Sequence, residues 1–236
     1  PGKISDMFKA LFKNDQAMTV VVSIILVYTS LNICGNLVLY FFRFDVGNEG
    51  AYSIFAAVAF AAQVLVMMVI PLLRKRFSKS QLFISGFVIQ IAGFAVILIM
   101  AFAKLYTPQS WYILCLPGIL IYLGYGMLNV IMTIFLSDSV DYGEVMNGTR
   151  EESVIFSMQT FTVKLASGVA VFLAGLVVDW IHLDTAAAVQ TQDTLDALRM
   201  WMTIPSVILL IVGIFVFKRF YKLDDTRMEE IKSKLN

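Results

Sequence analysis

Charged residues are scarce in this sequence. They make up 15% of the 236 residues, whereas hydrophobic residues make up 59%. A typical soluble domain has about 25% charged residues, and its helices are about 10–14 residues long with one polar face. The composition therefore argues against a soluble fold. The net charge of +1 gives no reason to expect a nucleic-acid partner.

Residues that commonly carry chemistry are also few. The two cysteines, Cys34 and Cys115, lie inside apolar segments, so we expect no disulfide. The single histidine, His182, lies at a loop edge, where a solvated role is more common than proton transfer. Zinc-protease, phosphate-loop, C-x-x-C and nucleophile-elbow motifs are missing. Asp138 and Asp141 adjoin a charged loop rather than a water-excluded pocket, so we predict neither an enzyme nor a metal site.

Long apolar runs account for the excess of hydrophobic residues. A transmembrane helix needs about 20 residues, and six runs are long enough. They lie at about 17–42, 51–73, 81–103, 111–136, 153–181 and 199–221. The sequence thus predicts an all-α membrane protein whose six transmembrane helices form one bundle over 17–221.

Basic residues give the predicted orientation of this bundle. Lys and Arg concentrate in 1–16, in the loop RKRFSKS at 74–80, and in 218–234, whereas the loop 182–198 has none. Because short cytoplasmic loops are enriched in Lys and Arg, we expect both termini to be cytoplasmic. We interpret the loop 74–80 as a topology anchor.

Two polar segments flank the bundle. Residues 1–16 alternate apolar and basic residues, which is typical of a linker or a short helix on the membrane surface. This opening lacks an initiator Met and resembles an interior linker, so we expect the chain to be a piece of something longer. Residues 222–236 carry mixed charge and predict a solvated cytoplasmic helix.

Lys164 is the most informative single residue because it lies near the middle of the fifth span. A lysine at that depth costs about 2.5–3.5 kcal/mol and should face a partner or a water-filled cavity. Polar and small residues recur with it at steps of three and four. They are Ser153, Ser157, Thr160, Gly168, Val171 and Gly175. We favour a cavity-lining stripe; a snorkelling lysine with glycines for close helix packing remains the alternative.

Other polar residues suggest two further groups. Asn32, Asn36 and Asn129 lie in spans that can share a cavity with Lys164, although single buried amides often only link helices. The second group lies in SDSVDYGEVMNGTREE, read as the connector between spans four and five. Its charges flank the helix ends and can form ion pairs that hold one conformational state. They are Asp138, Asp141, Glu144, Arg150 and Glu152.

Three motifs in this region carry a family resemblance. They are D-x-x-D-Y-G-E at 138–144, R-x-E-S at 150–153 and S-x-Q-T-x-x-x-K at 157–164. Together with FKALFKNDQ at 8–16 and YKLDDTRMEEI at 221–231, they resemble the glycoside–pentoside–hexuronide:cation symporters, and the melibiose branch is closest in pattern. The resemblance covers essentially the whole chain, but only the C-terminal half of such a transporter.

The resemblance implies a major facilitator superfamily fold in which this chain forms helices seven to twelve. It implies sugar symport with Na⁺, H⁺ or Li⁺ by alternating access in the bacterial plasma (inner) membrane. The expected partners are a sugar or glycoside, the lipid bilayer and the N-terminal six-helix half of the same transporter. That half would supply most of the ligands of the coupling cation. No other cofactor is expected.

The resemblance also implies roles for individual residues. Lys164 would line the cavity, with Thr160 and Val163 as sugar-side contacts beside Ser157 and Gln159. Asp138, Asp141 and Arg150 would belong to a cytoplasmic charge network that links the halves. Asn129 stands where the melibiose branch has an aromatic residue, so a stacked galactoside does not carry over.

Two other classes of protein compete with this interpretation. A self-contained six-helix channel or homodimeric carrier would need a pore-lining ring or a complete ion site, and the sequence suggests neither. An intramembrane hydrolase would need a nucleophile at mid-membrane, whereas the acids here lie at the membrane edge.

Overall fold

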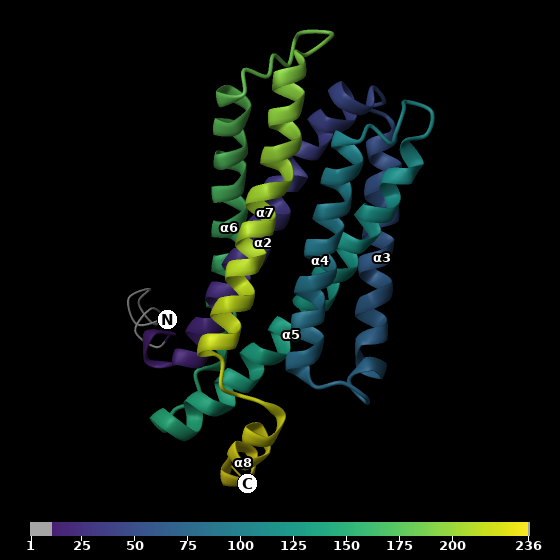
Figure 1. Ribbon diagram of the computed structural model, residues 1–236. Coiled ribbons are helices and arrows are strands. Elements are labelled where there is room, and N and C mark those ends of the chain that lie inside the picture. Colours follow the sequence, from purple (N-terminus) through teal and green to yellow (C-terminus); the bar gives the residue numbers. More distant parts are fainter. Residues whose placement is uncertain (1–10, 236) are drawn as a thin grey trace.

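The structure is a computed structural model that describes residues 11–235. Residues 1–10 of the predicted linker lie outside the described residues. The long helices are α2 (Asp15–Tyr40), α3 (Ala51–Leu73), α4 (Lys79–Phe102), α5 (Cys115–Asn147), α6 (Glu152–Trp180) and α7 (Gln192–Phe220) (Figure 1). The shorter ones are the π-helix η1 (Phe41–Val46), the 3₁₀ helix η2 (Trp111–Leu114) and α8 (Asp225–Leu235).

Six of the helices in 11–235 are long and apolar enough to cross a membrane, and this part of the chain contains no strand. The predicted all-helical fold with six spans is confirmed. The α3–α4 and α5–α6 connections lie with α8 at one end of the bundle, which we call the terminal end (Figure 1). The α2–α3, α4–α5 and α6–α7 connections lie at the opposite end.

Two helices extend further than the sequence indicated. The segment 137–152, predicted as a connector, is helical up to Asn147, where Gly148 ends α5 with φ +72°. The charges suggested a loop, but no residue before Gly148 stops the helix, and charged side chains are tolerated once a helix leaves the bilayer. Similarly, α7 begins at Gln192 instead of 199, because the Thr191 side chain accepts a hydrogen bond from the Thr194 N–H and caps it.

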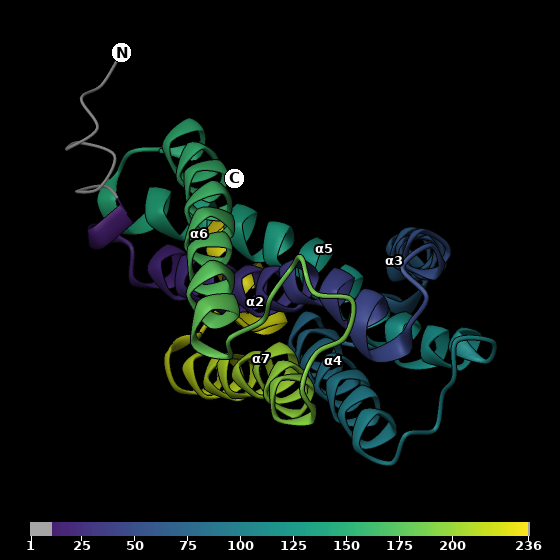
Figure 2. The ribbon, with the colours of Figure 1, turned by 90° about the horizontal axis from the view of Figure 1, so that it is seen from above.

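Helix α2 packs against α6 and α7, and α5 packs against α3 and α4. Seen from above, α2 lies between α5 and α7, and α3 lies at the end of the bundle away from α6 (Figure 2). Small residues allow the closest approach, between α4 and α5. A Cβ on Gly124 would lie 2.5 Å from the Gly86 carbonyl oxygen, so neither helix has room for a side chain there. Aromatic residues such as Phe83, Phe87 and Phe135 fill the core around this contact.

The tail forms a docked helix. Leu223, Met228 and Ile231 are buried together, and Tyr142 and Val145 of α5 pack against them. The predicted tail helix is solvated on most of its surface, but Met228 and Ile231, three residues apart on α8, give it one face to bury, and Leu223 joins them from just before the helix. This docking places Asp225 beside the α3–α4 connection.

Candidate functional site

The polar stripe predicted on α6 forms one exposed face of that helix. Ser157, Thr160, Lys164 and Gly168 are all exposed, whereas the residues on the opposite face are packed against the bundle. The packed residues are Ile155, Met158, Thr162, Ala166, Ala170, Ala174 and Val177. Lys164 lies near the middle of α6, and it has no hydrogen-bond or ion-pair partner among residues 11–235.

Glycines on this side of the bundle are not explained by packing within it. A Cβ added to Gly35, Gly168 or Gly175 would meet nothing within 4 Å. This contrasts with Gly124, where a Cβ would collide with α4. The interpretation of the α6 glycines as close-packing sites therefore finds no support inside this bundle, and the space beside them is open.

Helices α2 and α5 continue the polar surface. Asn129 of α5 is half-buried, and its Nδ2 donates to the Tyr28 hydroxyl of α2 over 2.6 Å. The Asn32 and Asn36 amides donate to backbone carbonyls one turn earlier, at 2.7 Å each. Asn129 therefore links two helices, while Asn32 and Asn36 are tied to their own helix.

These residues define a surface that we call the open wall. It comprises Tyr28, Asn32, Gly35 and Asn36 of α2, Asn129, Thr133 and Ser137 of α5, and the exposed stripe of α6. Of the remaining predicted residues, Gln159 and Val163 are half-buried on α6. Within 11–235 the structure brings none of the predicted amides into hydrogen-bond contact with Lys164. Their cavity-lining role stays a prediction.

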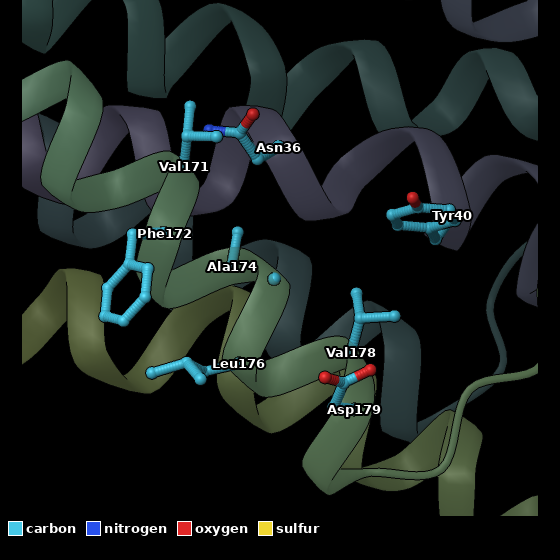
Figure 3. Close-up of a pocket in the computed structure, with 9 residues that line it drawn as sticks. Asn36, Tyr40, Val171, Phe172, Ala174, Leu176, Val178 and Asp179 are labelled. Atoms are coloured by element: carbon cyan, nitrogen blue, oxygen red, sulfur yellow. The ribbon is translucent and has the colours of Figure 1, made fainter.

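A pocket of about 570 Å³ lies on the open wall between α2 and α6. Asn36 and Tyr40 of α2 face it from one side, and Asp179, near the end of α6, faces it from the other (Figure 3). Val171, Ala174, Gly175 and Val178 form its apolar lining. The sequence did not point to Tyr40 or Asp179, because no periodicity within one helix reveals a pocket between two helices.

Arg150 at the terminal end gathers three predicted acids. Its guanidinium donates to Glu144 at 2.8 Å, to Asp141 at 3.0 Å and to Glu152 at 3.1 Å. These hydrogen bonds, Glu144 first, raise the pKa of Arg150 above its usual value. These ion pairs link the end of α5 to the start of α6. Arg150 is exposed, so solvent screens the pairs.

Asp138 does not belong to that cluster, so the predicted five-residue charge group divides in two. Asp138 is buried and pairs with Lys79 at the start of α4. Lys79 Nζ also lies 3.4 Å from Asp225 of α8, and Asp225 accepts from Arg74 at 3.2 Å. The sequence suggested that Lys79 is part of the topology anchor at 74–80, whereas its side chain forms a buried ion pair.

The electrostatics of Asp225 follow from this arrangement. Its partial burial alone raises its pKa, but Arg74 and Lys79 stabilise the carboxylate and outweigh that effect. The pKa of Asp225 therefore lies below its usual value of 3.8. The docked tail helix is thus held by charge as well as by its apolar face.

A second buried ion pair lies at the opposite end and was missed from the sequence. Arg199 donates to both Asp45 carboxylate oxygens, at 2.8 and 2.5 Å, and to Asp196 at 2.7 Å. The Tyr106 hydroxyl donates to Asp45 at 2.6 Å. Arg199 and Asp45 side chains are each 3% exposed, so the pair joins the end of η1 to α7 in the protein interior.

Among residues 11–235, no group of three or more His, Cys, Asp or Glu side chains is arranged to hold a metal ion. The charged residues instead pair with one another at the two ends of the bundle. The open wall between those ends carries amides, hydroxyls and one lysine, a set suited to hydrogen bonding with a polar solute.

Known proteins resemble the whole chain. The family described as MFS/sugar transport protein matches residues 1–225. The uncharacterized symporter YjmB of Bacillus subtilis is 25% identical over 99% of this chain and 49% of its own length. The raffinose carrier protein of Pediococcus pentosaceus is 23% identical over 98% of this chain and 35% of its own. The isoprimeverose transporter of Lactiplantibacillus pentosus is 25% identical over 94% of this chain and 44% of its own length. The chain spans less than half the length of these curated relatives.

Proposed function

Because the chain belongs to the MFS/sugar transport protein family, we propose that it is one six-helix bundle of a sugar:cation symporter. In this proposal the open wall faces the N-terminal bundle of the same transporter, and sugar crosses between the two by alternating access. The coupling cation, Na⁺, H⁺ or Li⁺, is bound mainly by the N-terminal bundle. The terminal end faces the cytoplasm of a bacterium.

The position of Lys164 is the observation that carries this proposal. It lies midway along a membrane-length helix, exposed and without a partner in 11–235. A lysine facing lipid at that depth would be costly, since ionisable residues inside membranes face a cavity or a partner. A second bundle across the open wall provides both. The surrounding stripe of hydroxyls and glycines supports the same interpretation.

Uptake by the complete transporter tests the proposal. Purified full-length protein in liposomes is tested with raffinose, isoprimeverose, lactose and a glucuronide, with and without a Na⁺ or proton gradient. We expect cation-dependent uptake of at least one sugar, and a loss of on the order of tenfold or more in Lys164→Gln. The control is Lys75→Gln, which removes another exposed lysine, in the α3–α4 connection.

Three outcomes would contradict parts of the proposal. Uptake without any cation dependence would refute symport. Normal coupled uptake in Lys164→Gln would show that the open wall is not part of the sugar or cation path. A purified gene product containing six spans, which transports as a pair of copies, would support a homodimeric carrier instead.

A further inference from the structure

The pocket between α2 and α6 contains a carboxylate that the fold does not account for. Asp179 is exposed in the last turn of α6, which carries no basic residue. A negative charge there opposes the helix dipole and is unfavourable. The Asp179 carboxylate has no hydrogen-bond or ion-pair partner among residues 11–235. Neither α6 nor its packing benefits from this acid, which suggests that a ligand does.

Gly175 keeps space free in the same pocket. It lies one turn before Asp179, lines the same pocket, and a Cβ added to it would meet nothing within 4 Å. Its lack of a side chain is therefore not needed for packing within the bundle. The pocket of about 570 Å³ therefore keeps its space beside Gly175, and Val171 and Val178 contribute to its apolar lining.

The chemistry of the lining selects among possible ligands. Asp179 offers a charged acceptor, Tyr40 a hydroxyl and Asn36 an amide oxygen, because the Asn36 Nδ2 already donates to the Asn32 carbonyl. A single carboxylate gives too few ligands for a cation site. An anion would be repelled. A neutral molecule with several hydroxyl groups and an apolar C–H face matches both the polar groups and the lining.

From this geometry we propose that the pocket of Asn36, Tyr40, Gly175 and Asp179 is a vestibule site for a neutral sugar ring. The inference rests on the proposed transport function and deepens it. The pocket shares Asn36, Val171 and Gly175 with the predicted cavity wall. It lies apart from the predicted sugar contacts around Lys164, because Gly175 lies eleven residues beyond Lys164, or about 16 Å along a helix. The sugar would be bound here on its way to or from the mid-membrane site, near the end of the bundle opposite the terminal end (Figure 1).

Transport kinetics of the full-length protein in liposomes test this site. The probes are lactose and raffinose as neutral sugars and methyl glucuronide as an anionic one. We expect Asp179→Asn to raise KM for the neutral sugars about fivefold or more with little change in kcat, because a charge-assisted hydrogen bond is lost. The same variant should favour methyl glucuronide relative to the neutral sugars, since a repulsive charge is removed.

A second variant tests the space instead of the charge. Gly175→Leu should raise KM more than Gly175→Ala, because the larger side chain fills the pocket without colliding with the bundle. The controls are Asp193→Asn, an exposed acid at the same end, and Val169→Leu, which adds bulk to α6 outside the pocket lining. Size-exclusion chromatography verifies that each variant is folded.

The outcomes separate the two proposals. If the wild type transports sugars but Asp179→Asn and Gly175→Leu keep normal KM values, the vestibule site is refuted and the transport function stands. If Gly175→Leu alone is defective, and fails to assemble, the second bundle fills the pocket and the vestibule site is refuted as well. If the wild type transports no sugar, the proposed function is refuted and the vestibule site with it.

Discussion

At the scale of single residues, burial decides which charges matter to the fold. Lys79 and Arg199 have side chains that are 6% and 3% exposed, and each meets an aspartate from another helix. A charge can be buried in this way only when it is paired and hydrogen-bonded. The partners are 59 and 154 positions apart in sequence. Helical periodicity shows which residues share a face but not which helices are neighbours, so neither pair was predictable.

The buried pair at the end opposite the terminal end should contribute strongly to stability. Asp45→Ala leaves Arg199 buried without its main partner, which typically costs about 3–5 kcal/mol. We expect the apparent unfolding midpoint to fall by on the order of 10 °C. Thermal unfolding of the purified protein in detergent at a fixed scan rate measures this.

Glu49→Ala provides the matched control for that experiment. Glu49 is four residues from Asp45 and pairs with Arg43, but both side chains are exposed and their atoms are 3.6 Å apart. Such surface pairs contribute about 0–1 kcal/mol, so the midpoint should hardly move. Equal shifts in the two variants would refute the distinction between the buried and the exposed pair.

At the scale of helices, the sequence predicted correctly which side of a helix is exposed, but it misplaced the residues at which helices begin and end. The α6 stripe is one continuous exposed face, as its three- and four-residue spacing indicated. The end of α5 was misplaced because Asp138, Asp141 and Glu144 suggested a loop, although Gly148 is the residue that ends the helix. The docking of α8 was missed for a related reason. Its charges dominate the sequence, whereas Leu223, Met228 and Ile231 determine its position.

Acid should release the tail helix. The pKa of Asp225 is lowered in the folded protein, so its ion pairs stabilise the docked helix above the usual carboxyl pKa of 3.8. That contribution is lost as the pH falls through the lowered value. A spin label on Ser233→Cys should therefore be immobile at pH 7 and become more mobile below about pH 4.

Asp225→Asn removes the charge at every pH and should mobilise the label already at pH 7. Glu229→Gln is the control, because Glu229 is an exposed acid on the same helix with no ion pair among residues 11–235. If the label responds to pH equally in Asp225→Asn and in the unsubstituted background, another acid holds the helix.

At the scale of the whole molecule, the six long apolar runs were sufficient to predict six spans, and the motifs at 138–164, with the segments 8–16 and 221–231, were sufficient for the family. The match over 1–225 confirms the resemblance, and because the family and the relatives are transporters, the prediction that the chain is not an enzyme is also confirmed. The open wall required the structure, since it is assembled from three helices. Its exposure in 11–235 distinguishes it from the α4–α5 interface, where glycines are equally frequent but closely packed.

The two exposed sides of the bundle should differ in their contact with water. Thr133→Cys and Thr160→Cys lie on the open wall, whereas Val88→Cys and Ile208→Cys lie on the exposed apolar faces of α4 and α7. In a background without Cys34 and Cys115, a charged maleimide should label the wall positions at least about tenfold faster, because ions do not enter lipid. Similar labelling rates at all four positions would refute the prediction that water reaches the open wall.

The glycines of this bundle include two groups with different surroundings. Gly86 and Gly124 allow α4 and α5 to meet, so a larger residue at either position would collide with the facing helix. Gly35, Gly168 and Gly175 border open space, and the fold of these six helices tolerates replacement there. Under the proposed function, we therefore expect substitutions at those three positions to alter what lies across the open wall and to leave the stability of this chain unchanged.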